Sequence, residues 1–482
     1  MSDTPTSTPS AFEPEANDDR RPLGVQPLSP LDGRYQPAVH ELGDHLSEAG
    51  LNRARVHVEI EWLLYLTDHG MFGASRVPAE AARQLRASAR EFGQADIDEL
   101  ARLEATTRHD VKAVEYYIRR RLDALGLSSL AELTHFAATS EDINNLAYAL
   151  TVQQAVREVW LPKLSAVVEK LRSMAVDERD AVMLARTHGQ PATPTTMGKE
   201  LAVFVHRLDR LIAILDRQEY LGKFNGATGT YAAHLAAAPD IDWQAVSRQF
   251  VTSLGLDWNP LTTQIESHDW QAELYSQIVH IGRVLHNLCT DIWTYISLGY
   301  FRQTPVAGAT GSSTMPHKVN PIRFENAEAN LELSAAVLDS LSATLVTSRL
   351  QRDLTDSTTQ RNIGVGLGHS LLALVNIERG LDELTLDKEL LLADLDRNWE
   401  VLAEAIQTVI RAEVAAGSSS IANPYELLKE LTRGRRVDAA IMTEFVEGLD
   451  LSADAKARLR ALTPRSYAGI ASDLVDLVAP RP

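Results

Sequence analysis

Apolar residues recur every three or four positions along five long stretches of this chain, and that spacing predicts amphipathic helices. The first stretch runs from Val152 to about Val176, with Pro162 as its only proline or glycine. A helix of this length would be roughly 40 Å long at 1.5 Å per residue. The other four stretches are 201–215, the one that starts near His268, and those that follow Pro321 and Arg361.

Five long helices within about 230 residues predict a helical bundle and an all-α fold class. Their apolar stripes are too wide for one partner helix each, so we expect the bundle to pack against other subunits as well. The predicted organisation is a disordered tail 1–23, an N-terminal helical domain 24–128, a central long-helix bundle 129–378 and a C-terminal helical domain 379–482.

Two glycine-rich segments, 222–233 and 364–368, require separate interpretation. Segment 222–233 predicts a loop or a short hairpin between helices. Segment 364–368 has glycine at alternate positions and mimics a dinucleotide-binding fingerprint. It does not match G-x-G-x-x-G and no strand is predicted before it, so we reject a dinucleotide site there.

Composition narrows the classes of function. The net charge of −18 argues against general nucleic-acid binding, but it allows an anionic small substrate bound by a local cluster of Arg and Lys. Cys289 is the only cysteine, and neither C-x-x-C nor H-E-x-x-H occurs, so no zinc site is expected. The tail lacks the apolar segment of a signal peptide, and no apolar run is long enough to span a bilayer. These features favour a cytoplasmic protein without membrane contact.

Polar segments between the helices concentrate residues that a buried core tolerates only with partners. The four main segments are 107–112, 134–145, 186–194 and 311–321, and two lesser ones are 32–35 and 351–357 with Arg361.

His188 lies in segment 186–194, where Pro191 and Pro194 predict a stiff loop. A firmly held imidazole suits general acid–base catalysis, because histidine titrates near neutral pH. The alternative is a capping histidine that bonds a turn, and for an isolated Thr-His-Gly that interpretation is the better one.

Segment 311–321 combines glycines, hydroxyl side chains and Lys318 ahead of a predicted helix, which together predict a carboxylate site. A Ser/Thr-rich surface turn is the alternative, but Met315 and Val319 are apolar and would be unusual there. Residue chemistry alone does not select Ser312 as a base, because a serine hydroxyl is a weak base and its anion needs nearby donors. A histidine would be the physical choice.

Several motifs carry a resemblance to a known family. The loop GSSTMPHKVNP resembles the signature loop of the fumarase/aspartase superfamily. In combination with RHDVKAVEYY, RTHGQPATP, TSEDINN, NPLTTQIE and QRDLTDST, the chain resembles the bacterial branch of the adenylosuccinate lyase family from about Leu28 to about Leu477.

The resemblance implies roles for individual residues. His188 would be the general acid, Ser312 the general base, and Glu325 the carboxylate that orients the acid. Lys318 and Asn320 would hold the succinyl carboxylates. Further succinyl or base contacts would be Thr139, Ser140 and Gln264, and the nucleotide and phosphate contacts would be Arg34, Tyr35, His109, Asp110, Arg352, Ser357 and Arg361. Arg108 departs from the family pattern, and it would add a phosphate contact or only a surface charge.

The family implies a three-domain fumarase/aspartase-type fold and a homotetramer whose active sites take segments from three subunits. The implied reaction in purine biosynthesis is a β-elimination that needs no cofactor or metal. It releases fumarate from adenylosuccinate, giving AMP, and from the succinylated aminoimidazole carboxamide ribotide. The alternatives are another fumarate-releasing lyase, such as argininosuccinate lyase or fumarase, or a catalytically silent structural member of the fold.

Overall fold

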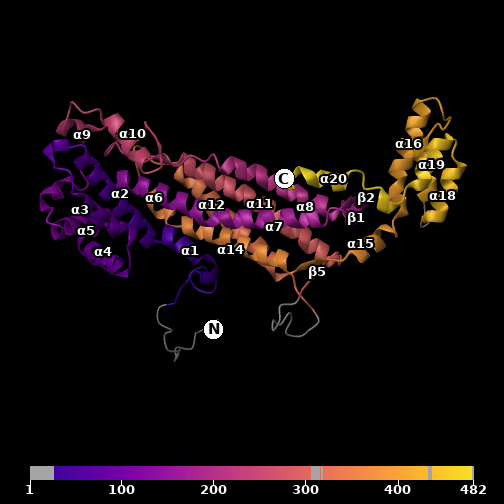
Figure 1. Ribbon diagram of the computed structural model, residues 1–482, viewed down its shortest axis with the longest axis horizontal. Coiled ribbons are helices and arrows are strands. Elements are labelled where there is room, and N and C mark those ends of the chain that lie inside the picture. The colour runs from indigo at the N-terminus through magenta and orange to yellow at the C-terminus, as the bar shows by residue number, and fades with distance from the viewer. Residues whose placement is uncertain (1–25, 305–314, 316–317, 433–436, 480–482) are drawn as a thin grey trace, which may run out of the picture.

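Long helices dominate the computed structural model, which describes residues 26–304, 315, 318–432 and 437–479. The described part is 68% helical, and its sheets have two strands each, so the all-α prediction is confirmed. Figure 1 shows an elongated molecule in which a central bundle separates an N-terminal group of helices from a C-terminal group.

The central bundle contains the five predicted long helices. Its first helical run, Ser140 to Asp177, is continuous in direction but includes a π-helical segment, η3. The bounds are α6 Ser140–Gln154, η3 Ala155–Trp160, α7 Leu161–Asp177, α8 Met197–Leu215, α11 Asp269–Ser297, α12 Ile322–Leu345 and α14 Ile363–Asp382.

Helical spacing of apolar residues explains how the bundle packs. On α7, Leu164, Val167, Val168 and Leu171 are fully or almost fully buried, and they share one face of the helix. Helix α7 packs against α8 and α14, and α12 packs against α11 and α14. The π-helical segment ends just before Pro162, whose missing N–H cannot complete a regular α-helical ladder.

The N-terminal group packs around α2, which is buried on two faces. Val56 and Ile60 belong to an N-terminal core, whereas Val58 and Trp62 join the core of the bundle. Helix α2 therefore connects the two cores. The elements are α1 Gln36–Leu46, α2 Glu48–Asp68, η1 Met71–Gly73, α3 Ala79–Arg90, α4 Gln94–Thr107, α5 Asp110–Ala124 and η2 Ser128–Leu133.

The C-terminal group has its own small core and then returns to the bundle. Arg179 donates to the backbone oxygen of Ser472 at 2.9 Å, which holds the last described helices beside α8. The predicted domain boundary at 378 falls inside α14. The elements are α15 Lys388–Leu395, η4 Trp399–Leu402, α16 Ala403–Ala415, α17 Pro424–Thr432, α18 Ala439–Gly448, α19 Ala453–Ala461, η5 Pro464–Ser466, α20 Ala471–Leu474 and η6 Val475–Leu477.

Three small sheets complete the fold. Strands β1 Val182–Thr187 and β2 Gln190–Thr196 form an antiparallel hairpin. The other pairs are β3 Leu221–Gly222 with β4 Asp257–Trp258, parallel, and β5 Phe301–Gln303 with β6 Leu384–Leu386, antiparallel. Short helices α9 Ala232–Ala237 and α10 Trp243–Ser253 lie near the N-terminal group.

The hairpin corrects the prediction of a stiff loop over 186–194. Pro191 and Pro194 lie within β2 and pair with Arg186 and Leu184. Prolines are tolerated because both strands of a two-stranded hairpin are edge strands, and a bulge between Leu184 and Arg186 relaxes the ladder. Segment 222–233, by contrast, is mostly loop, as predicted, and contributes only Gly222 to a strand.

Candidate active site

The N-terminus of α6 holds two of the predicted substrate contacts. Thr139 is the N-cap residue, and Ser140 is the first residue of the helix. The Thr139 N–H donates to Asp142 Oδ2 at 2.8 Å, which fixes the conformation of this helix end. A helix N-terminus offers N–H groups and a partial positive charge, so this end can bind a carboxylate.

Arg352, Gln264 and Glu141 meet beside this helix end. Arg352 Nη2 donates to Glu141 Oε1 at 2.8 Å, and its Nη1 donates to Gln264 Oε1 at 3.4 Å. The buried Nε of Arg352 has no hydrogen-bond partner among the residues that the structure describes. An unpaired buried donor is costly, so this guanidinium has a donor available for a ligand. Two of the predicted polar segments and the NPLTTQIE motif therefore come together here.

Asp110 organises a neighbouring charge cluster. Arg55 is buried and donates to Asp110 Oδ2 at 2.9 Å, and Arg361 lies 3.6 Å from the same oxygen. Burial acts to raise the pKa of Asp110, but Arg55, the Val111 N–H, His109 and Arg361 outweigh it and lower the pKa. Asp110 is therefore an anion that orients two arginines. Arg55 also donates to Asn144 at 2.9 Å, which links this cluster to α6.

His109 and Arg108 lie at the corner between α4 and α5. His109 is the N-cap of α5, and its Nδ1 accepts from the Lys112 N–H at 3.2 Å. Arg108 is exposed at the end of α4 with φ +53°, the left-handed region. The Arg108 side chain has no described contact that assigns it a function.

Ser357 lies in α13 Thr355–Gln360, beside the Arg352 group. Its backbone N–H donates to Asp356 Oδ1 at 2.7 Å, and that carboxylate is buried. Asp356 Oδ2 lies 3.5 Å from His268 Nε2, and Asp356 Oδ1 lies 4.0 Å from Arg352. The described contacts thus place Ser357 next to the guanidinium of Arg352.

Arg34 and Tyr35 line a separate cavity of about 350 Å³ at the side of the bundle. Tyr35 is the N-cap residue of α1, and its hydroxyl accepts from Asn326 Nδ2 at 3.5 Å. Arg323 and Arg379 line the same cavity from α12 and α14. The cavity is therefore basic and adjoins the first turn of α12.

The start of α12 carries Lys318, Asn320 and Glu325. Lys318 is exposed, and Glu325 lies in the first turn of the helix. Glu325 Oε1 accepts from the indole N–H of Trp293 at 3.2 Å. Ser312 and the neighbouring part of the signature segment lie outside the described residues. Helix α12 has 24 residues, so its start lies about 36 Å from the Arg352 group at its other end.

His188 occupies the tip of the β1–β2 hairpin. His188 and Gly189 form a two-residue turn with φ of +52° and +73°, the pattern of a type I′ turn. The tip is exposed, while Arg186 anchors the hairpin through Asp394 at 2.6 Å. His188 is thus exposed at the tip of a hairpin that the Arg186–Asp394 ion pair holds in place.

The start of α6, capped by Thr139, and the β1–β2 hairpin, which carries His188, lie at opposite ends of the bundle within one chain (Figure 1). The helical run from Ser140 to Asp177 separates them and is about 55 Å long at 1.5 Å per residue. One chain therefore cannot bring its own His188 to its own α6 N-terminus.

Sequence reasoning also missed the partner of His135. Buried Glu59 accepts from the His135 N–H at 3.1 Å and lies 2.5 Å from its Nδ1. Burial acts to lower the pKa of His135, but the hydrogen bond and charge of Glu59 outweigh it and raise the pKa. Charged or polar and apolar residues alternate from Arg53 to Trp62 in α2, so no local signal distinguishes the buried Arg55 and Glu59 from their partly exposed neighbours.

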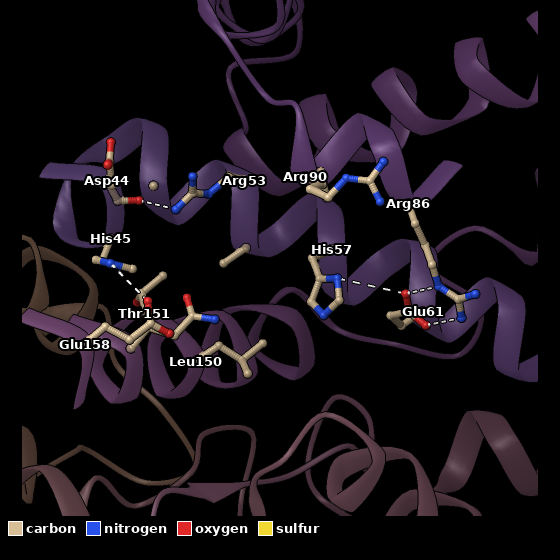
Figure 2. Close-up of a pocket in the computed structure, with 14 residues that line it drawn as sticks. Asp44, His45, Arg53, His57, Glu61, Arg86, Arg90, Leu150, Thr151 and Glu158 are labelled. Atoms are coloured by element: carbon tan, nitrogen blue, oxygen red, sulfur yellow. Dashed lines mark hydrogen bonds and ion pairs between the residues drawn. The ribbon is translucent and has the colours of Figure 1, made fainter. Parts of the chain in front are cut away.

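A cleft of about 600 Å³ between α2, α3 and α6 contains none of the predicted site residues (Figure 2). Arg86 donates two hydrogen bonds of 2.7 Å to Glu61, and His57 lies 4.0 Å from that carboxylate. Burial lowers the pKa of His57. Arg86 and Glu61 neutralise each other's charge, so the cleft gives no reason to place the active site there.

Within the described ranges, no three His, Cys, Asp or Glu side chains could together hold a metal ion. None of the described helices has the length and apolar character that a bilayer span requires.

Comparison with known families identifies two matching regions. The lyase family model matches residues 33–335, and the adenylosuccinate lyase C-terminal model matches residues 348–468. Adenylosuccinate lyase from Escherichia coli K12 is 49% identical over 453 residues, covering 93% of this chain and 98% of that protein. The Vibrio cholerae adenylosuccinate lyase is 48% identical over 454 residues, with the same coverage of 93% and 98%.

Solved structures share the fold at lower identity. Fumarate lyase from Mesorhizobium sp. BNC1 aligns with a TM-score of 0.72 and 20% identity, covering 91% of this chain and 97% of that one. The 3-carboxy-cis,cis-muconate lactonizing enzyme from Pseudomonas putida aligns with a TM-score of 0.69 and 21% identity, covering 92% and 96%. The predicted fumarase/aspartase-type fold is therefore confirmed.

Proposed function

This chain belongs to the adenylosuccinate lyase family of the fumarase superfamily and is a lyase that acts on adenylosuccinate, and from that premise we propose how its residues carry out the reaction. The products are AMP and fumarate, and the succinylated aminoimidazole carboxamide ribotide is the second substrate in purine biosynthesis. Argininosuccinate lyase, fumarase and a silent structural member are not favoured, because the C-terminal match is specific to adenylosuccinate lyases.

The separation of about 55 Å between the α6 N-terminus and His188 carries the proposal that several subunits build each site. We propose that the chain assembles as a homotetramer in which the central bundles of the subunits pack together. Large apolar side chains are exposed along the bundle helices of a single chain and would be covered in such an assembly. They include Val203, Ile214, Trp293, Leu298 and Leu333.

The general acid and the general base of the elimination come from different segments of the chain. Ser312 removes the proton from the carbon next to a carboxylate, and the electron pair moves to form the double bond of fumarate. Lys318 and Asn320 stabilise the charge that develops on that carboxylate. His188 donates its proton to the departing amine nitrogen, and Glu325 of another subunit orients its ring.

Most of the substrate contacts lie at the end of the bundle where α6 begins, opposite the hairpin that carries His188. Thr139, Ser140 and Gln264 contact the succinyl group, and the unpaired Nε of Arg352 is suited to an anionic oxygen. His109, Asp110, Ser357 and Arg361 surround the nucleotide, and Arg34 with Tyr35 supplies phosphate contacts from the basic cavity beside α12. Arg108, which precedes His109 at the corner between α4 and α5, adds positive charge beside the nucleotide contacts. The acidic chain thus gathers its arginines where an anionic substrate binds.

Mixing two inactive variants tests the shared site. His188→Gln and Thr139→Ala should each be inactive alone, and co-assembled tetramers should regain up to about a quarter of wild-type activity, because some sites then receive both intact residues from different chains. Thr139→Ala mixed with Arg352→Ala is the matched control, and its activity should not exceed the average of the two separate variants, since one chain supplies both residues. Wild-type protein without turnover of adenylosuccinate would refute the lyase assignment, whereas active wild type without recovery on mixing would refute only the sharing.

A further inference from the structure

A fully buried ion pair lies behind the predicted succinyl contacts. Lys223 Nζ is 2.9 Å from Asp142 Oδ1, and both side chains are 0% exposed. Removing two charges from water costs more than their attraction usually returns, so such a pair is a poor source of stability. Its position in the fold suggests another use.

Asp142 ties a helix end to the glycine-rich loop. Its Oδ2 accepts from the Thr139 N–H at 2.8 Å, and its Oδ1 accepts from the Asn225 N–H at 2.9 Å. The Gly226 N–H donates to the same carboxylate at 3.1 Å. One carboxylate therefore fixes the start of α6 relative to loop 222–229.

The loop continues to the segment that carries Gln264. Asn225 Nδ2 donates to Thr262 Oγ1 at 2.8 Å. A Cβ on Gly229 would lie 2.3 Å from the Thr262 carbonyl oxygen, so glycine permits a close approach of the two backbones. Thr262 is two residues before Gln264, and Lys223 also bonds Asn145 of α6 through its backbone at 2.8 Å.

We propose that Asp142 and Lys223 are positioning residues that set Thr139 and Ser140 at the correct distance from Gln264 around the succinyl group. The inference rests on the proposed function. Both residues are sealed from solvent, so they act through their neighbours and do not touch the substrate. Carboxylate recognition tolerates little displacement, since shifts near 1 Å can cost about a hundredfold in rate. A buried charge pair gives this framework a single stable arrangement.

Kinetics with two ligands test the assignment. Asp142→Asn places an amide NH₂ against backbone donors, and Lys223→Met removes the cation. Each should lower kcat/KM for adenylosuccinate by about tenfold or more. The inhibition constant of AMP, which lacks the succinyl group, should change less than about twofold, because the arginine contacts are untouched. A general loss of structure would weaken both ligands together.

Amide hydrogen exchange reports on the framework without reference to activity. In both variants, exchange should accelerate in residues 137–145, 222–230 and 260–266, and residues 161–177 of α7 should be unchanged. Asn225→Ala provides a milder variant that keeps the Asp142–Lys223 pair and leaves no buried charge unpaired, in case the others do not fold. It should show the same pattern of exchange and a smaller loss of kcat/KM.

Ile410→Ala is the control for stability, because it opens the separate C-terminal core and should leave kcat/KM unchanged. Wild-type kcat/KM in folded Asp142→Asn, Lys223→Met and Asn225→Ala would overturn the inference, as would a parallel loss of AMP affinity. Absence of activity in the wild type would instead count against the proposed function, and the exchange data would still test the framework.

Discussion

A single residue, His188, combines an unusual backbone conformation with a proposed chemical role. Its φ of +52° lies in the left-handed region, which most side chains adopt at a cost of about 1–2 kcal/mol. Asparagine adopts this region more readily than alanine does. Chemistry and turn stability can therefore be separated by choosing the substituent.

His188→Asn should lower kcat by about a hundredfold or more while the melting temperature stays near that of the wild type. The imidazole is lost, but the turn is kept. Gly189→Ala provides the reverse change, because its φ of +73° strains alanine while His188 remains. Steady-state kinetics and thermal unfolding of both variants measure the two effects, and a fully active His188→Asn enzyme would refute the role of the acid.

Arg352→Ala should raise the KM for adenylosuccinate severalfold. The Nε of Arg352 has no hydrogen-bond partner among the described residues and can therefore donate to an anionic oxygen of the substrate. Arg349→Ala is the matched control: its side chain is 82% exposed and pairs with nearby Asp353. Initial rates at varied substrate concentration compare the two. Equal KM values for both variants would remove Arg352 from the substrate site.

At the scale of elements, periodicity located the long helices but not every feature between them. The five helices follow from apolar spacing that each segment carries alone. The β1–β2 hairpin was missed because Pro191 and Pro194 argue against a strand, and their tolerance depends on the absence of further strands alongside. The π-helical segment η3 was also missed, although Pro162, two residues after it, is a local signal for an irregular helix.

Contacts between distant elements explain what was missing from the predicted site. The family resemblance supplied His188, Lys318 and Arg352 as candidates, whereas residue chemistry alone favoured a histidine over Ser312. Arg55 and Lys223 were not selected, because their partners Asp110 and Asp142 lie far away in sequence. Only the packing of α2, α6 and the glycine-rich loop brings them together.

The Glu59–His135 pair joins α2 to the segment before α6 and should give stability a defined pH dependence. The pKa of His135 is raised in the folded chain, so its contribution is complete below the unfolded value of about 6.5 and is lost as pH rises through the folded pKa. Glu59→Gln should therefore lower the melting temperature more at pH 6 than at pH 9. If the difference in melting temperature between the wild type and Glu59→Gln is independent of pH, or is larger at pH 9, this linkage is contradicted.

At the scale of the whole molecule, the proposed shared site would link assembly to activity, because the two groups of predicted site residues lie far apart in one chain. Leu333 on α12 is 52% exposed in the single chain, and we expect other subunits to cover it. Leu333→Asp should dissociate the proposed tetramer and abolish activity together, as measured by light scattering and turnover. Tyr425→Asp changes an exposed side chain in the C-terminal group and should affect neither. A fully active monomer would contradict the shared site.

The π-helical segment at Ala155–Trp160 also sets the rotational phase of the longest helical run. A π-helical segment behaves as an inserted residue within an α-helix, and each residue of an α-helix turns by about 100°. Deleting one residue there would make the run uniformly α-helical and keep α6 in phase with α7. Refolding the same residues as regular α-helix would instead rotate α6 by about 100° relative to α7. Thr139 and Asp142 would then face a different side of the bundle. The angular setting of this end of the proposed active site thus depends on one irregular turn about 25 Å away.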